Sequence, residues 1–127
     1  MNVFLIEDAL QVRKRLRALL QTVPGVTVVG EADSVAGGIQ GVIDSGADTV
    51  LLDLQLVDGS GLDVLPVLKA RRPGLHVVVL SNFTSAQHRQ ASLAAGADVF
   101  LDKSNEFRRV PEILRAWLSG ADSGTVH

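Results

Sequence analysis

Five short runs of aliphatic and β-branched residues recur along the chain at nearly even intervals. They cover residues 2–6, 26–31, 49–53, 76–81 and 98–101. Successive runs therefore begin 22 to 27 residues apart, which leaves room for one strand, one helix and two loops in each interval. Several runs are apolar at consecutive positions instead of alternate ones, which is typical of strands buried on both faces of a parallel sheet.

Helical patterns fill the intervals between these runs. Apolar residues recur at helical spacing between positions 12 and 23, and we expect Arg13, Lys14 and Arg17 beside them to face solvent. Further helices are expected at residues 35–43, 62–68, 84–95 and 107–118. Ser60 is placed to cap the helix at 62–68, and Pro66 should remove a hydrogen bond from that helix or bend it.

Strands and helices that alternate in this order form an open, doubly wound parallel α/β sheet with right-handed crossovers. No linker or low-complexity segment interrupts the pattern. The last residues are small and polar, so we expect one domain over residues 1–119 and a flexible C-terminal tail over residues 120–127.

Composition narrows the classes of function. The formal net charge of −2 disfavours direct DNA binding, because phosphate neutralisation needs clustered basic charge. The chain has no cysteine, which excludes disulfides, thiolate metal sites and cysteine nucleophiles. Its apolar runs are far shorter than the roughly 20 residues of a membrane span, and its first residues do not resemble a signal peptide. We therefore expect a soluble cytoplasmic domain that binds neither DNA nor membranes.

Polar residues follow the expected strands at their carboxyl ends, where ligands bind in sheets of this kind. They are Glu7, Asp8, Asp53, Ser81, Asp102 and Lys103. Each alone has a structural explanation, such as a helix cap at Asp8, and it is their coincidence at one edge that indicates a site.

Three carboxylates in one cleft repel each other, and a hard divalent cation relieves that repulsion. Oxygen ligands without His or Cys favour Mg²⁺ or Mn²⁺ over Zn²⁺. A metal, a lysine and a hydroxyl together suit a phosphoryl group. Asp53 can then act as the nucleophile and carry the phosphoryl group as an aspartyl phosphate.

Five motifs in order carry a resemblance to a known family. They are VFLIED at 3–8, VLLDL at 50–54, DGSGL at 58–62, VVVLS at 77–81 and GADVFLDKS at 96–104. In this order they resemble the receiver domain of the response regulators of bacterial two-component signalling. The resemblance implies a flavodoxin-like fold, with a five-stranded sheet in the order 2-1-3-4-5 and a receiver domain over residues 1–119.

The resemblance also implies roles for the acidic residues. Asp53 matches the phosphoacceptor, and Asp8 matches the carboxylate that binds Mg²⁺ directly together with it. Glu7 matches the acid that reaches the metal through water, and the backbone carbonyl of Gln55 matches the remaining protein ligand. Many receivers have two aspartates where this chain has Glu7 and Asp8; a glutamate reaches farther, but the charge is kept.

Three further residues match the parts of the family's switch. Ser81 matches the switch hydroxyl, Lys103 the phosphate-binding lysine and Phe100 the switch aromatic. Phosphorylation is expected to draw Ser81 inward and let Phe100 change rotamer, which alters a surface over residues 84–118. Ser104 follows Lys103 where proline is common, so the cis peptide bond usual at that point is left open.

The implied function is a phosphorylation-dependent receiver. It would accept a phosphoryl group from a sensor histidine kinase, a phosphotransfer protein or a small phosphodonor, and signal to a protein partner or a second copy through residues 84–118. It would not be a turnover enzyme, although it would catalyse its own phosphorylation and dephosphorylation. Two alternatives stay open: a receiver-like interaction module that works without phosphorylation, and the receiver fragment of a longer transcriptional regulator.

Two other functions are disfavoured by the residues at particular positions. A phosphatase with an aspartate nucleophile needs a second acid two residues later, where this chain has Gln55. A flavodoxin-type cofactor carrier needs a glycine- or hydroxyl-rich phosphate loop after the first strand, where this chain has Glu7 and Asp8.

Overall fold

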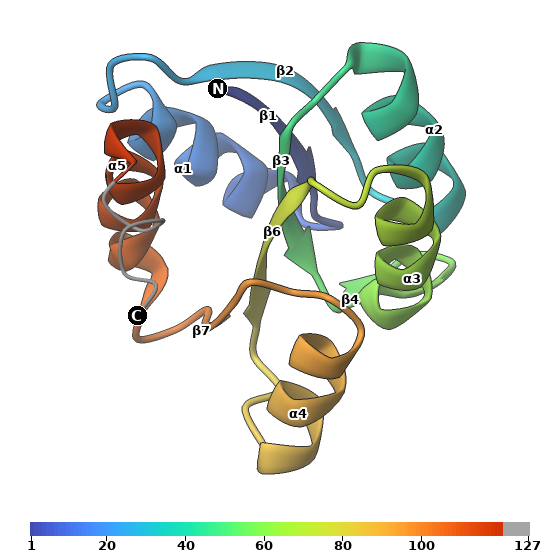
Figure 1. Cartoon of the computed structure of the whole chain (residues 1–127). Helices are drawn as coiled ribbons and strands as arrows, with labels where there is room; N and C mark the ends of the chain where they lie inside the picture. Colours follow the sequence, from blue (N-terminus) through green and yellow to red (C-terminus); the bar gives the residue numbers. More distant parts are fainter. Residues whose placement is uncertain (121–127) are drawn as a thin grey trace.

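The computed structural model describes residues 1–120, and its centre is a parallel sheet of five strands (Figure 1). The strands are β1 (Asn2–Ile6), β2 (Thr27–Ala32), β3 (Thr49–Asp53), β6 (His76–Ser81) and β7 (Val99–Asp102). Their order across the sheet is β2-β1-β3-β6-β7, which confirms the expected doubly wound α/β topology. The expected tail lies outside the described residues, apart from Gly120.

Helices cover both faces of the sheet (Figure 1). They are α1 (Leu10–Leu20), α2 (Val35–Ser45), α3 (Gly61–Arg71), α4 (Ala86–Ala94) and α5 (Val110–Ser119). In Figure 1, α1 and α5 lie on one side of the sheet, α2 and α3 lie on the other, and α4 hangs below them. None of the helices within residues 1–120 has the length and apolar character needed to span a membrane.

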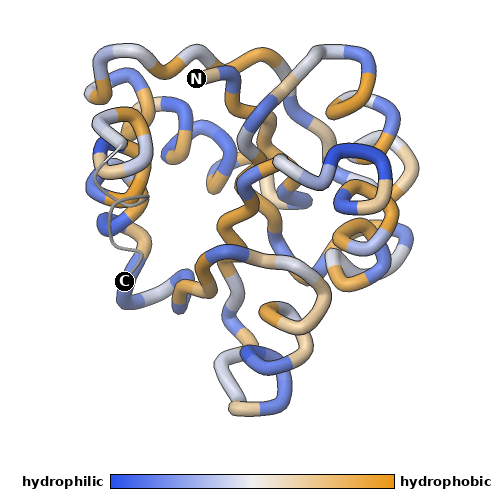
Figure 2. Tube along the Cα trace, viewed as in Figure 1, coloured by the Kyte–Doolittle hydropathy of each residue, from blue (hydrophilic) through white to orange (hydrophobic). Residues whose placement is uncertain are grey.

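The consecutive apolar residues of the strands serve two cores. On β3, Val50 and Leu52 pack into the core beneath α2 and α3. Leu51, between them, packs into the core beneath α1 and α5. Both faces of the sheet are therefore buried. Figure 2 shows hydrophobic residues concentrated along the central strands. This is why the strands have no alternating pattern in the sequence.

The structure also explains how α2 forms despite its glycines. Ser34 caps the helix by accepting a hydrogen bond from Gly37 N–H at 3.0 Å. A Cβ atom at Gly41 would overlap the ring of Phe4. Gly41 therefore weakens the helix but allows α2 to approach β1 closely. Helix α2 also continues past the expected end at residue 43, to Ser45.

Other helix boundaries follow from caps and prolines. Ser60 caps α3 as expected, in a capping box with Asp63. Pro66 lies inside α3, yet the helix continues to Arg71. A 3-10 turn, η1 (Phe107–Arg109), precedes α5, and the adjoining Pro111 sits in the first turn of α5, where its missing N–H has no intrahelical partner to lose.

Several expectations were wrong in detail. Strands β2 and β7 each begin and end one residue later than expected. Helix α4 is shorter than the expected 84–95, because Ser85 is its N-cap and accepts a hydrogen bond from His88 N–H. The alternative explanation of Asp8 as a helix cap does not hold, because the N-cap of α1 is Ala9, which has no side-chain hydrogen bond. The small antiparallel pair of β4 (Gln55–Leu56) and β5 (Gly59–Ser60) was not foreseen.

Candidate functional site

Three carboxylates meet at the carboxyl ends of β1 and β3. Glu7 and Asp8 follow β1, and Asp53 is the last residue of β3. One carboxylate oxygen from each lies within 4.8 Å of the others. Glu7 and Asp53 are almost wholly buried, at 2% and 4% exposure, whereas Asp8 is exposed. The structure therefore brings together the acidic trio expected from the sequence, in a spacing that could hold a metal ion.

Lys103, directly after β7, joins the two buried acids. Its Nζ lies 2.9 Å from Glu7 Oε1 and 3.2 Å from Asp53 Oδ1. Its backbone N–H donates to Ser81 O at 2.9 Å, which ties the lysine to the end of β6. The ammonium is thus aimed at the expected phosphoacceptor.

Burial dominates the titration of the two acids. It raises the pKa of Glu7 from 4.5 to about 7, although hydrogen bonds from Lys103 and from Ala9 N–H oppose the shift. Burial also raises the pKa of Asp53, opposed mainly by the charge of Lys103. Burial by itself would lower the pKa of Lys103, but the Glu7 hydrogen bond and the Asp53 charge outweigh it and leave that pKa raised. Two acids facing one lysine leave the site short of positive charge, so it favours a cation.

The loop after β3 adds backbone groups to the same place. Gln55 N–H donates to Asp53 Oδ1 at 3.2 Å, and Gln55 opens the small β4–β5 pair. Gly61, the first residue of α3, packs against the backbone of β3: a Cβ atom there would overlap Asp53 O. The hydrogen bond from Gln55 and the close approach of Gly61 therefore hold Asp53 in place through the backbone.

Ser81 ends β6 and is fully buried. It pairs across the sheet with Asp102, next to Lys103. Its Oγ accepts a hydrogen bond from Phe83 N–H at 2.8 Å. The expected switch hydroxyl thus lies at the same sheet edge as the carboxylates.

The family assignment follows from comparison with known proteins. The sequence model of the response regulator receiver domain matches residues 3–115. The chain belongs to this family. The strand order and the acid–lysine cluster described above are those that the resemblance in the sequence implied.

Curated relatives of this receiver are response regulators. The DNA-binding transcriptional activator DevR/DosR of Mycobacterium tuberculosis is 36% identical over 102 residues, which are 80% of this chain and 47% of that protein. The nitrate/nitrite response regulator protein NarL of Escherichia coli is 32% identical over 123 residues, which are 97% of this chain and 55% of that protein. The chain spans about half the length of the curated relatives it matches.

Solved receiver structures share the fold. The isolated REC domain of RcsB from Salmonella enterica serovar Typhimurium, in the presence of phosphomimetic BeF3-, superposes with a TM-score of 0.87 at 24% identity; the match covers 94% of this chain and 89% of that one. The receiver domain of the putative response regulator NarL from Mycobacterium tuberculosis gives a TM-score of 0.84 at 23% identity, over 94% and 96% of the chains. At this identity the likeness supports the fold alone.

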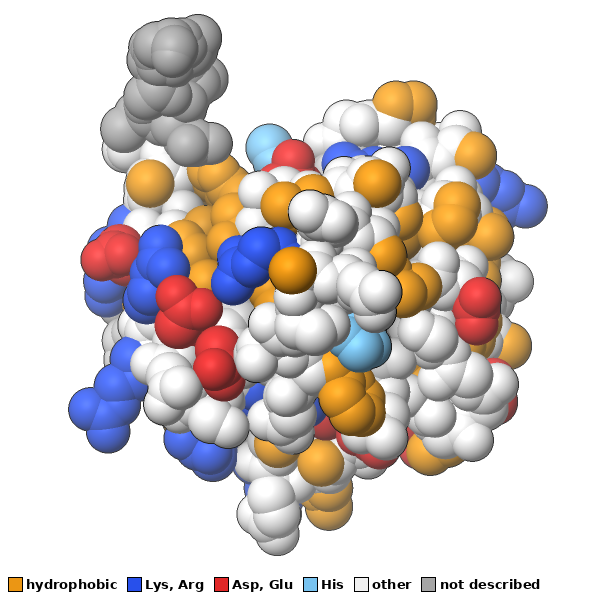
Figure 3. Space-filling model, turned by 90° about the horizontal axis from the view of Figure 1, so that it is seen from below, with side chains coloured by type: hydrophobic (Ala, Val, Ile, Leu, Met, Phe, Trp, Pro, Cys, Tyr) orange, Lys and Arg blue, Asp and Glu red, His pale blue; other side chains and the backbone are white. Residues whose placement is uncertain are grey.

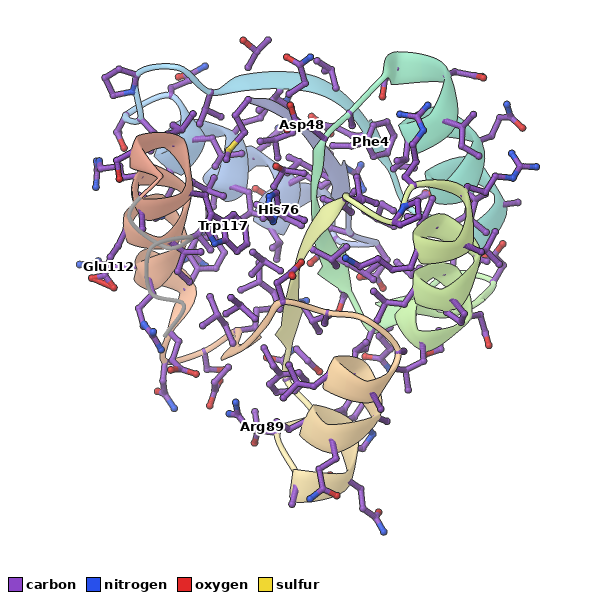
Figure 4. All side chains as sticks on the ribbon, viewed as in Figure 1. Phe4, Asp48, His76, Arg89, Glu112 and Trp117 are labelled. Carbon is purple, nitrogen blue, oxygen red and sulfur yellow. The ribbon has the colours of Figure 1, made fainter. Side chains whose placement is uncertain are left out.

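Phe100 of the receiver, on β7, points into the core beneath α2 and α3 and is 4% exposed. The guanidinium of Arg89 on α4 lies over its ring, with Cζ 4.9 Å from the ring centroid. Arg89 Nη1 also donates to Phe100 O at 3.4 Å. Figure 4 shows Arg89 reaching out from α4, the helix nearest this strand. The expected switch aromatic is therefore held inward here, and its movement stays a prediction.

One group near the site was missed in the sequence. Arg13 was expected to face solvent, and that expectation was wrong: its side chain is 16% exposed. Arg13 Nη1 donates to Glu7 O at 2.7 Å, and Nε contacts Glu31 Oε1 at 2.9 Å. Glu31, an acid within the strand beside β1, was the sequence signal that could have identified this partnership.

The opposite edge of the sheet is built differently. There Asp48 accepts the backbone N–H of Asn2 at 3.1 Å, and Trp117 stacks on His76 with ring centroids 4.7 Å apart (Figure 4). These residues lie at the amino ends of the strands, away from the carboxylates. Trp117 is the only tryptophan in the sequence, so its fluorescence reports on this edge and not on the acidic site.

No peptide bond within residues 1–120 is cis, including the bond between Lys103 and Ser104.

Proposed function

We propose that this receiver accepts a phosphoryl group on Asp53, in the cytoplasm, from a sensor histidine kinase, a phosphotransfer protein or a small phosphodonor. The observation that carries the proposal is the placement of Lys103 Nζ, 3.2 Å from Asp53 Oδ1, beside a trio of carboxylates spaced for a cation. A buried nucleophilic carboxylate, a cationic donor and a metal site are the parts that phosphoryl transfer needs.

The residues divide the chemistry between them. A carboxylate oxygen of Asp53 attacks phosphorus, the new P–O bond forms as the bond to the donor breaks, and the donor leaves with that electron pair. Lys103 hydrogen-bonds a phosphoryl oxygen as its contact with Asp53 is replaced. Asp8, Asp53 and the Gln55 carbonyl would hold Mg²⁺ or Mn²⁺, with Glu7 reaching it through water. The ion, when bound, supplies the positive charge that offsets the phosphoryl oxygens.

The output would be a shift between two conformations. Ser81 turns toward the phosphoryl oxygens, and the space behind it favours the inward rotamer of Phe100, which is the one that this structure holds. The surface over residues 84–118 changes with it, and a protein partner or a second copy of the chain docks there. The receiver transfers the phosphoryl group to itself and to water, and so acts on its own aspartate instead of turning over a separate substrate.

A second candidate rests on the length of the relatives. Because the chain spans about half of regulators such as DevR/DosR, it fits the receiver part of a longer transcriptional regulator. In that arrangement we propose that DNA contact is made outside this receiver. Figure 3 shows the face toward which β3 and β6 run. On this face basic and acidic side chains are interspersed, whereas DNA contact needs clustered basic charge.

Intact-mass analysis after incubation with acetyl phosphate tests the proposal. We expect one added phosphoryl group on the wild-type protein with Mg²⁺, and none after the metal is removed with EDTA. The Asp53→Asn variant should gain none, whereas Asp44→Asn, a control at an exposed aspartate on α2, should behave as the wild type.

Stoichiometric phosphorylation of Asp53→Asn would show that the acceptor is a different residue. A wild-type protein that never gains mass would favour the module that works without phosphorylation.

A further inference from the structure

Arg13 reaches from the first turns of α1 back to the loop that carries two of the acids. Its Nη1 donates to Glu7 O at 2.7 Å and lies 3.5 Å from Asp8 O. Its Nε contacts Glu31 Oε1 at 2.9 Å. One guanidinium therefore joins the end of β2 to the backbone of both acidic residues after β1.

The loop has few other ways to hold its shape. The N-cap of α1, Ala9, offers no side-chain hydrogen bond. Glu7 N–H donates to Ala32 O at 2.9 Å, which fixes where the loop leaves the sheet. The Glu7 carboxylate accepts from Ala9 N–H at 3.1 Å through Oε2 and contacts Lys103 through Oε1. The carbonyls of the two acidic residues are the groups that Arg13 engages.

We propose that Arg13, anchored by Glu31, is a positioning residue that sets the Glu7–Asp8 backbone so that both carboxylates face Asp53 at cation-binding distance. This inference rests on the proposed function, since it assigns Arg13 a role at the proposed metal site. The planar fork of a guanidinium allows simultaneous donation to a carboxylate and to a carbonyl, which a lysine cannot reproduce in one geometry.

Charge and geometry make opposite predictions for this residue. A positive charge near a cation site repels the cation, so removing Arg13 would strengthen Mg²⁺ binding if charge were its only contribution. If Arg13 orients the ligands, removing it weakens binding, as happens when groups that orient metal ligands are lost. The sign of the change therefore separates the two roles.

Arg17 supplies a matched control. It lies one turn further along α1 and contacts the other carboxylate oxygen of Glu31. Within residues 1–120, Arg13 hydrogen-bonds the Glu7 carbonyl, whereas the hydrogen bond of Arg17 goes to Glu31 and not to the Glu7 or Asp8 carbonyl. Arg17→Gln removes the same charge from the same partner and leaves the loop contacts in place.

The test is an NMR titration of each unphosphorylated protein with Mg²⁺, following the amides of residues 7, 8, 53 and 55. We expect the dissociation constant of Arg13→Gln to rise about tenfold, and that of Arg17→Gln to stay level or fall. Arg13→Lys keeps the charge but has all its N–H donors on one nitrogen, so its dissociation constant should lie between those of Arg13→Gln and wild type. At saturating Mg²⁺ the phosphorylation rate of Arg13→Gln should return to within about twofold of wild type, because its ligands remain present.

Before metal is added, the amide shifts of Glu7, Asp8 and Ala9 should differ between Arg13→Gln and wild type, and agree between Arg17→Gln and wild type. Equal Mg²⁺ affinity in wild type and Arg13→Gln would overturn the positioning role while leaving the proposed function intact. So would equal weakening in both variants, which would point to α1 as a whole. A wild-type protein without saturable shifts would instead refute the metal site, and the inference with it.

Discussion

The protonation of Glu7 should control how the stability of the metal-free protein depends on pH. Glu7 is 2% exposed, and burial raises its pKa to about 7. In the unfolded chain the same group titrates near 4.5. Between these two values the native state binds more protons than the unfolded chain. The free energy of unfolding therefore falls as the pH rises through this interval, and levels off above it.

The size of the effect follows from the same two values. Each pH unit between them corresponds to about 1.4 kcal/mol, so the full interval corresponds to a loss on the order of 3 kcal/mol. That is a large share of the roughly 5–15 kcal/mol that stabilises a typical domain. The proton is shared with Asp53, whose pKa is raised as well, so the titration belongs to the pair.

The assay is urea unfolding at several pH values between 4.5 and 8, for wild type and for Glu7→Gln. Glutamine keeps the shape of the protonated acid and cannot ionise. Glu7→Gln should therefore match wild type near pH 5 and exceed it in stability near pH 8. With Mg²⁺ present, the stability of the wild type should instead rise with pH, because the metal binds the deprotonated acids in place of the proton.

Glu106 provides an internal control of opposite sign. Hydrogen bonds from Asp102 N–H and from Arg109 lower its pKa, so it stabilises the fold above its ordinary titration range and stops doing so as the pH falls. Glu106→Gln should thus leave the high-pH loss of stability unchanged. If wild type and Glu7→Gln keep a constant difference from pH 4.5 to 8, burial does not govern this acid and our reasoning is refuted.

Two more variants test the packing and the switch. Gly61→Ala should destabilise the protein by about 1–3 kcal/mol in urea unfolding, because its Cβ would overlap the backbone oxygen at the end of β3. The control Gly74→Ala has no atom within 4 Å of its Cβ and should change the stability little. Equal effects of the two variants would show that the contact between Gly61 and β3 is easily relieved. Arg89→Gln should raise the outward population of Phe100 about two- to fivefold, since it removes a ring contact worth about 0.5–1 kcal/mol; unchanged Phe100 ring signals in NMR would show that Arg89 does not hold the ring.

The sheet was predictable because its strands are buried on both faces. Such strands must be apolar at consecutive positions, and the runs at β1, β3 and β6 mark their bounds to the residue. The β4–β5 pair was not predictable in this way, because strands of two residues contain too few positions for a pattern. The start of α4 is determined by the Ser85 cap and not by apolar spacing.

The candidate site was predictable to the same extent. In a parallel sheet, residues that end different strands meet at one edge, so Asp53 and Lys103 could be brought together without coordinates. Arg13 could not. Helical periodicity showed that it lies off the apolar face of α1, but a loop that folds back over the first turn of a helix leaves no periodic signal. Glu31 within β2 could have indicated an ion-pair partner for Arg13, but only the distance to the Glu7 carbonyl identifies its contact with the loop.

The stability of this domain is unevenly distributed. Asp53 ends a strand that both cores enclose, so we expect the amides of β3 to exchange only when the whole fold opens. On α4 the one buried side chain is that of Ser92, and in Figure 1 the helix stands apart from the layers above it. Opening α4 therefore requires far less free energy than opening β3. Asp53 thus lies on an element that both cores enclose, while the surface proposed to change includes a helix with a single buried side chain, so we expect a small free-energy change at the site to be enough to remodel that surface.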